Sequence, residues 1–207
     1  AEWFTLRTFH LTATMASKLL SDGDTDTTTT KELMSSLIKS WFNRSRSTEP
    51  MVIGSRNEEA VLLHLATKPY VLDMYECGLL ESKDNPWLAA SPDAIAVIDD
   101  GDGEPSYCVV EVKTRVSPEK IAESLRLAKK HNNQVIWTDF DSEVWNECVE
   151  QDHSNQIMVQ LLVTGFNRCC YIVSRAGSEG GKGRAIYMVV GKITNQQRYY
   201  YLSTLAE

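Results

Sequence analysis

The segment YCVVEVKTR, residues 107–115, decides the fold of this 207-residue chain. Its β-branched residues predict a strand. Successive side chains of a strand point to opposite faces, so Glu111 and Lys113 project together while Val112 faces the core. A carboxylate at this place can hold a divalent cation, and the ammonium beside it can bind a phosphate or polarise a water molecule. The Val112 carbonyl is a further hard-oxygen ligand. Taken alone, an E-x-K pair on a strand is more often a solvated face on which the two charges compensate each other.

A second carboxylate precedes this strand. Residues 88–99, LAASPDAIAVID, predict two short extended segments around a turn at Pro92, with Asp93 at the start of the second one. Two carboxylates from neighbouring strands, a backbone carbonyl and water molecules would form an octahedral oxygen site suited to Mg²⁺ or Mn²⁺. Such a metal ion lowers the pKa of a bound water and stabilises charge on a scissile phosphate.

The rest of the chain predicts helices packed on a sheet. Helices are expected over residues 10–20, 31–43, 55–66, 118–130 and 151–163, and further strands over residues 71–77, 169–174 and 185–191. Residues 21–30 and 44–50 predict polar loops, the insert at 99–106 and the Gly-rich segment 177–183 predict hairpin loops, and residues 199–201 predict a strand or an interface. This order favours an α/β or mixed α+β fold, with a central mixed β-sheet flanked by helices.

Composition and charge set outer limits on function. Hydrophobic residues make up 43% of the chain, but none of its apolar stretches approaches the roughly 18 residues that span a membrane, so no membrane association is expected. The net charge of −7 argues weakly against a nonspecific nucleic-acid coat, although a basic groove can lie on an acidic protein. The odd number of cysteines, five, and the lack of a C-x-x-C pair indicate reduced thiols in an intracellular protein, with the compartment left open.

Several weak motifs occur in a specific order. They are Gly54-x-x-x-Glu58, Ser91-Pro92-Asp93, Glu111-Val112-Lys113, and Gln156 placed seven residues before Val163-Thr164-Gly165. In this combination the chain resembles the PD-(D/E)XK nuclease superfamily, and more narrowly its lambda exonuclease and YqaJ-like viral recombinase branch. The resemblance covers roughly residues 3–173 and implies a restriction-endonuclease-like core.

The resemblance also implies roles for the helix-borne residues. Glu58 would complete the metal site or orient the water, with Glu59 as the fallback. Gln156 would help to position the water. Gln160 is the alternative, because it lies one helical turn later on the same face.

A separate match concerns the 5′-phosphate. In the family, a W-x-x-L-R segment precedes a T-A-S turn that helps to hold this group. Here Trp3, Leu6 and Arg7 precede Thr12-Ala13-Thr14, in which Thr14 replaces the usual Ser. Arg7 would pair with the phosphate as a planar fork, Thr14 would donate its hydroxyl, and Ser91 would be a third contact.

The resemblance therefore implies one nuclease domain over residues 1–207, with an N-terminal helical part at about 1–50 and a catalytic core at about 51–191. Asp93, Glu111, the Val112 carbonyl and Glu58 would bind Mg²⁺, with Mn²⁺ as a substitute, and Lys113 would orient or deprotonate the attacking water. The expected activity is 5′→3′ exonuclease digestion of linear double-stranded DNA with a free end, in recombination or repair. An endonuclease or repair nuclease of the same fold, and a non-catalytic DNA-binding module, are the alternatives. The resemblance also suggests a homo-trimeric ring and a single-strand annealing protein as partner.

Overall fold

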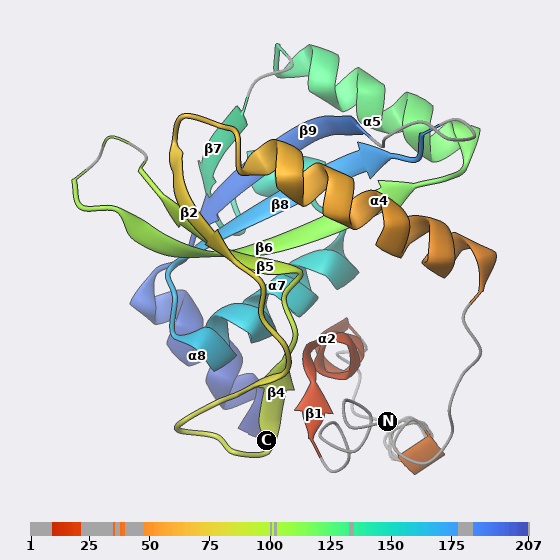
Figure 1. Cartoon of the computed structure of the whole chain (residues 1–207). Coiled ribbons are helices and arrows are strands. Elements are labelled where there is room, and N and C mark those ends of the chain that lie inside the picture. Colours follow the sequence, from red (N-terminus) through yellow and green to blue (C-terminus); the bar gives the residue numbers. More distant parts are fainter. Residues whose placement is uncertain are drawn as a thin grey trace.

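The computed structural model describes residues 10–21, 35, 38–39, 48–99, 101, 103–132, 135–177 and 184–206 (Figure 1). The expected loop at 21–30 and helix at 31–43 therefore fall almost wholly outside the described residues. The described helices are α2 (Ala13–Ser21), α4 (Glu49–Leu65), α5 (Pro118–Lys130), α6 (Glu143–Cys148), α7 (Gln151–Thr164) and α8 (Asn195–Ala206). The described strands are β1 (Leu11–Thr12), β2 (Val71–Tyr75), β3 (Leu80–Glu81), β4 (Leu88–Ala90), β5 (Ala94–Ile98), β6 (Ser106–Arg115), β7 (Val135–Asp139), β8 (Arg168–Arg175) and β9 (Arg184–Lys192).

Most of these strands form one mixed sheet of six strands, in the order β2-β5-β6-β8-β9-β7. The β2–β5, β5–β6 and β8–β9 pairs are antiparallel, whereas β6–β8 and β7–β9 are parallel. The expected central mixed sheet is thus confirmed. A smaller sheet has the order β1-β4-β3 and brings the N-terminal segment beside β4 through a parallel pair. The two extended segments around Pro92 therefore belong to different sheets.

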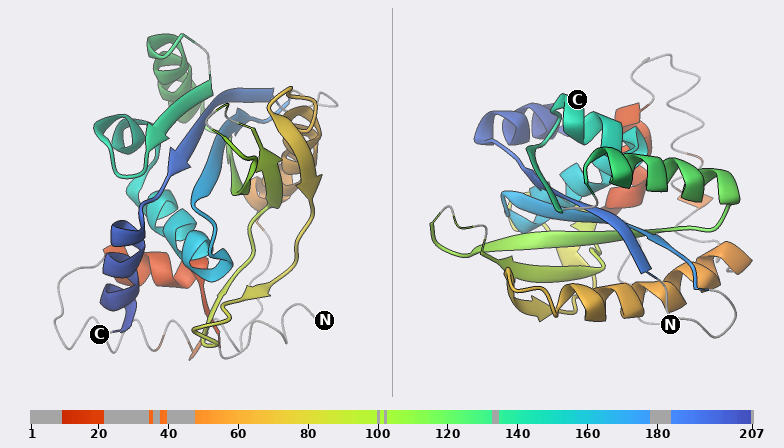
Figure 2. Two further views of the ribbon diagram at one scale, coloured as in Figure 1. Left: turned by 90° about the vertical axis from the view of Figure 1, so that its left-hand side faces the viewer. Right: turned by 90° about the horizontal axis from the view of Figure 1, so that it is seen from above.

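Helices cover both faces of the large sheet (Figure 2). Helix α4 packs on one face, where Val61 and Leu65 join Val110 and Ile172 in a buried cluster. Helices α5, α6 and α7 pack on the other face, in a second cluster that contains Val109 and Tyr171 of the sheet together with the three residues Leu127, Trp145 and Ile157 of these helices. A third cluster joins α7 to α2 and β4, so α7 lies between the large sheet and the N-terminal part. The two faces of β6 are thereby held against different helices.

Local sequence signals explain the ends of two helices near the site. Helix α5 begins after Ser117, whose hydroxyl accepts a hydrogen bond from the Lys120 N–H at 3.3 Å, and Pro118 occupies the first turn, as the sequence predicted. Helix α7 ends at Gly165, whose φ of 74° is a left-handed conformation that costs glycine little. The glycine of the V-T-G motif thus ends the helix that carries Gln156.

Some sequence predictions about the elements were wrong. Helix α4 begins at Glu49 rather than near Ser55, because Pro50 is accommodated in its first turn and Gly54 lies inside the helix instead of ahead of it. Residues 199–201 belong to helix α8, not to a strand. Leu11 and Thr12 form β1 at the start of the expected first helix, and β7 and α6 were not anticipated.

None of the helices in the described part of the chain is long and apolar enough to cross a membrane. All five cysteines are free, and four of them are buried.

Candidate active site

The candidate site lies where β6 loses one of its two neighbouring strands. Strand β5 begins at Ala94 opposite Val110, whereas β6 continues to Arg115 and keeps only β8 beside it. Asp93 occupies this open edge. Its N–H donates to the Val110 carbonyl at 3.0 Å, and its Oδ2 accepts a hydrogen bond from the Val112 N–H at 2.7 Å. The N–H and C=O of one strand residue point to the same edge, so the Val112 carbonyl faces the side on which Asp93 lies.

The carboxylate of Glu111 is buried and receives hydrogen bonds on both oxygens. Oε1 accepts from Lys113 Nζ at 2.5 Å and from Gln156 Nε2 at 2.8 Å, and Oε2 accepts from Gln160 Nε2 at 2.6 Å. Lys113 Nζ also donates to Gln156 Oε1 at 3.1 Å. The structure therefore brings both glutamines to Glu111, and Gln160 is fully buried whereas Gln156 is half-buried and lines a cavity with Asp93.

Glu58 reaches the same group from α4. Burial, followed by the negative charge of Glu111, raises the pKa of Glu58, and Lys113 partly offsets this effect. Burial also raises the pKa of Asp93 to about 8, with Glu111 and then Glu58 as the next causes. Glu59, the fallback for Glu58, is exposed. The negative charge of Glu111 thus raises the pKa values of both Glu58 and Asp93, and a bound cation would relieve this repulsion.

The donor set fits a hard cation. Among the described residues, no three His, Cys, Asp or Glu side chains lie close enough to hold a metal ion by themselves. The site offers Asp93, Glu111 and the Val112 carbonyl, with water to complete the coordination, and Mg²⁺ commonly accepts such partial coordination by protein.

A polar cavity of about 240 Å³ adjoins this group. Its lining residues are Thr12, Ala13, Thr14, Leu79, Ser91, Asp93 and Gln156. Thr14 at the start of α2 is exposed, and the Ser91 hydroxyl donates to the Gly78 carbonyl at 3.3 Å. The structure thus gathers two of the three expected phosphate contacts at one cavity with Asp93. The third, Arg7, lies outside the described residues.

With this geometry in place, the comparisons with known proteins decide the family. A protein-family model described as the YqaJ-like viral recombinase domain matches residues 2–167, most of the chain. The chain belongs to the YqaJ-like viral recombinase domain family.

Solved structures of similar shape include the alkaline exonuclease LHK-Exo from Laribacter hongkongensis, with a TM-score of 0.64 and 14% identity over 99% of this chain and 88% of that one. The structure of LHK-Exo with dAMP gives a TM-score of 0.63 at 13% identity, again over 99% and 88% of the two chains. A SOX–DNA complex gives a TM-score of 0.51 at 11% identity, over 97% of this chain and 64% of that one. A search of curated protein sequences finds no significant match. Family membership and fold together support a DNA nuclease.

Sequence reasoning missed one buried residue of this YqaJ-like site. Asn57 precedes Glu58 on α4 and is only 5% exposed. Its Nδ2 donates to Thr114 Oγ1 at 2.9 Å on β6 and to Ser174 Oγ at 2.8 Å on β8. These bonds tie α4 to the strand segment just after Lys113, and so fix the side from which Glu58 approaches. A polar residue next to a motif carries no signal of this kind in the sequence.

His153 on α7 packs against the large sheet beside the site. Its Nδ1 lies 2.9 Å from the hydroxyl of Tyr171, which is fully buried and pairs with Glu111 across β6 and β8. Burial, followed by the positive charge of Lys113, lowers the pKa of His153 to about 4. His153 is therefore neutral near pH 7 and supports the side of α7 that faces β6.

Proposed function

We propose that this YqaJ-like protein is a Mg²⁺-dependent exonuclease that digests linear double-stranded DNA from a 5′ end. One observation carries the proposal. Asp93, Glu111 and the Val112 carbonyl meet at the open edge of β6, with Lys113 and Gln156 hydrogen-bonded beside them. Nuclease chemistry needs such a combination of hard-oxygen ligands and a cationic donor at one phosphate.

In this proposal Asp93, Glu111 and the Val112 carbonyl hold Mg²⁺, for which Mn²⁺ substitutes, and Glu58 on α4 orients a water molecule at the site rather than binding the metal directly. The metal ion would supply a bound water of lowered pKa and stabilise charge on the scissile phosphate. Gln160 keeps the buried carboxylate of Glu111 in one orientation through its 2.6 Å hydrogen bond.

Lys113 and Gln156 act on the attacking water. Their side chains are fixed against Glu111, so Lys113 can orient the water as an ammonium or take its proton as a neutral amine, while Gln156 holds it in line. The water oxygen then forms a bond to phosphorus and the bond from phosphorus to the 3′ oxygen breaks. That oxygen takes up the proton that the attacking water has lost, and the new end carries a 5′-phosphate.

The 5′ polarity rests on the polar cavity. The hydroxyls of Thr14 and Ser91 line it together with Asp93, so a terminal 5′-phosphate bound there would lie beside the metal ligands. Arg7 would add a bidentate contact, as the family resemblance implies. The names of the neighbours, an alkaline exonuclease and a SOX–DNA complex, agree with action on DNA.

Digestion of matched DNA substrates tests the polarity. Linear duplexes with a 5′-phosphate or a 5′-hydroxyl, and closed circular duplex, are incubated with the protein with and without Mg²⁺. The proposal predicts rapid digestion of the 5′-phosphorylated duplex, slower digestion of the 5′-hydroxyl duplex and no cutting of the circle.

Ser91→Ala should reduce the preference for the 5′-phosphate, whereas the same change at exposed Ser203 should not. Cutting of the circle would instead favour the endonuclease alternative, and absence of Mg²⁺ binding would favour the non-catalytic module.

The assembly proposed from the family resemblance is a homo-trimeric ring that works with a single-strand annealing protein. Sedimentation of the 23.3 kDa chain tests the ring. A mass of one or two chains at micromolar concentration would contradict it.

A further inference from the structure

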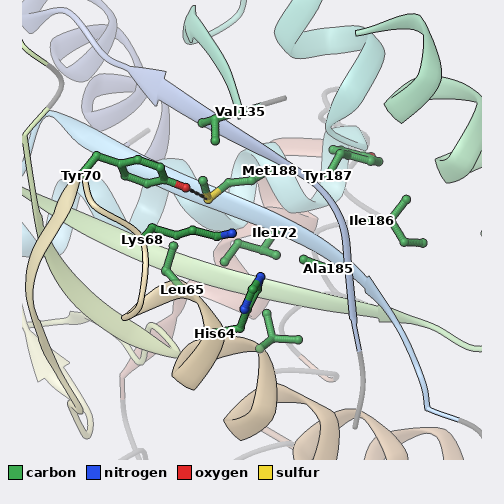
Figure 3. A pocket seen from close by; sticks show the side chains of 11 residues that line it. His64, Leu65, Lys68, Tyr70, Val135, Ile172, Ala185, Ile186, Tyr187 and Met188 are labelled. Atoms are coloured by element: carbon green, nitrogen blue, oxygen red, sulfur yellow. Dashed lines mark hydrogen bonds between the residues drawn. The ribbon is translucent and has the colours of Figure 1, made fainter. Parts of the chain in front are cut away.

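A second cavity lies on the face of the large sheet that α4 covers (Figure 3). Glu111 bonds instead to α7, on the other face. The cavity has a volume of about 170 Å³, and it is an open hollow lined by the C-terminal half of α4, the segment that follows it, and strands β7, β8 and β9. It shares no lining residue with the cavity that contains Asp93. The proposed nuclease chemistry therefore makes no use of it.

The floor of this cavity is apolar. Val61 and Leu65 of α4 and Ile172 of β8 form it, and all three are less than 5% exposed. Val135 of β7 and Met188 of β9 extend the apolar surface toward the edge of the sheet. A hollow of this kind gains free energy when an apolar group replaces the water in it.

Three polar side chains extend over the apolar floor: His64, Lys68 and Tyr70 (Figure 3). Among the described residues, none forms an ion pair with Lys68 or with the imidazole of His64. The Tyr70 hydroxyl has the Met188 sulfur, 4.0 Å away, as its acceptor, and a thioether accepts only weakly. Burial raises the pKa of Tyr70 to about 12, so its hydroxyl remains a donor near pH 7.

The charge of the lining is the opposite of the charge of the protein. The chain carries a net charge of −7, yet among the described residues no Asp or Glu lines this cavity, whereas a Lys and a His do. The C-terminal end of α4 favours cations nearby, which accounts for the two basic residues but not for the apolar hollow below them. An anionic group at Lys68 with an apolar body against Ile172 would satisfy both features.

We propose that this cavity is a binding site for a small amphipathic anion, a carboxylate or phosphate attached to an aromatic or branched aliphatic body. Lys68 and His64 hold the charged group, Tyr70 donates a hydrogen bond to it, and the body rests on the floor formed by Leu65 and Ile172. The occupant also contacts Val61, one turn after Glu58 on the same helix.

A fluorescent anion and its neutral analogue test the site. The probe is 8-anilinonaphthalene-1-sulfonate, and the analogue is N-phenyl-1-naphthylamine, which lacks the sulfonate. Lys68→Glu reverses the charge at the cavity, and Lys83→Glu makes the same change at an exposed lysine that does not line it. Trp137, whose ring lies 6.1 Å from that of Tyr70, reports occupancy through quenching that Trp137→Phe removes.

Saturable binding of the sulfonate at one site is expected, weakened about tenfold by Lys68→Glu, which is about 1.4 kcal/mol. Lys83→Glu should change the affinity less than about twofold, well under 1 kcal/mol. Binding of the neutral analogue should be equal in the wild type and Lys68→Glu, which also shows that the variant is folded. Equal weakening by both lysine variants, loss of the neutral analogue in Lys68→Glu, or absence of saturable sulfonate binding would each overturn the proposal.

Discussion

Asp93→Asn should stabilise the protein when no metal ion is bound. The carboxyl of Asp93 gives up its proton at about 8 in the folded chain, against an ordinary pKa of 3.8, because it is buried next to Glu111 and Glu58. The folded state thus holds a proton that the unfolded state has lost. Stability contributed by this group is therefore present below pH 3.8 and falls as the pH rises to about 8. Asparagine removes the charge and keeps an oxygen that can accept from the Val112 N–H.

The size of the effect follows from the two pKa values. Their separation sets a ceiling of about 6 kcal/mol at about 1.4 kcal/mol for each pH unit. Glu58, whose pKa is also raised, can hold the proton in place of Asp93, and Lys113 offsets part of the repulsion. We therefore expect a gain of about 2 kcal/mol at pH 9 and less than about 1 kcal/mol at pH 5. This gain would come at the cost of activity, as is common for residues of functional sites.

Urea unfolding with EDTA measures the change, with Asp84→Asn at an exposed position as the control. Mg²⁺ should then stabilise the wild type and have little effect on Asp93→Asn, because only the wild type retains the full ligand set. Two results would refute this reasoning: a variant that is less stable than the wild type at pH 9 with EDTA, or an equal gain from Mg²⁺ in both proteins.

Three further predictions concern the surroundings of the site. Gln160→Leu leaves Glu111 Oε2 without its hydrogen-bond donor, so the variant should lose about 1–3 kcal/mol of stability. The Mg²⁺ concentration needed for half-maximal nuclease activity should rise about tenfold or more. An unchanged Mg²⁺ requirement would contradict this prediction. The pKa of His153 is lowered in the folded chain, so on acidification the imidazole becomes protonated in the unfolded chain before it does in the folded one. Wild-type stability should therefore fall as the pH drops from 6.5 to about 4. His153→Gln should flatten that part of a plot of urea midpoint against pH. Gly191→Ala places a methyl group against the buried ring of Trp145, so its thermal midpoint should drop as expected for a loss of about 2 kcal/mol or more, and a wild-type midpoint would show that the ring can move aside.

The elements that local sequence could predict are those with strong local signals. The β-branched run of β6, the Ser-Pro start of α5 and the V-T-G end of α7 all act within a few residues, and each appears where the sequence placed it. Helix α8 also has a local start signal, although residues 199–201 within it were predicted to form a strand or an interface. Thr194 and Gln197 cap it reciprocally in a T-x-x-Q pattern, although the tyrosines that follow favour strands by propensity.

Contacts distant in sequence explain what could not be predicted. The parallel pairing of β1 with β4 places Thr14 beside Ser91, and nothing local in either segment indicates this partner. The choice between Glu58 and Glu59 depends on the rotation of α4, which the buried bonds of Asn57 to Thr114 and Ser174 hold in place. The choice between Gln156 and Gln160 had no single answer, because the two amides bond to different oxygens of Glu111.

Digestion of a linear, 5′-phosphorylated duplex by purified Lys113→Ala, with and without Mg²⁺, tests the central claim most directly. Lys113 is half-buried and bonded to Glu111 and Gln156, whereas Lys83 is exposed and does not line the cavity that contains Asp93, so Lys83→Ala is the matched control. The account predicts Mg²⁺-dependent digestion by the wild type and by Lys83→Ala, and a loss of at least about 100-fold in Lys113→Ala, a size typical for the loss of an acid–base group. Wild-type digestion by a folded Lys113→Ala, or digestion by the wild type in EDTA, would contradict it.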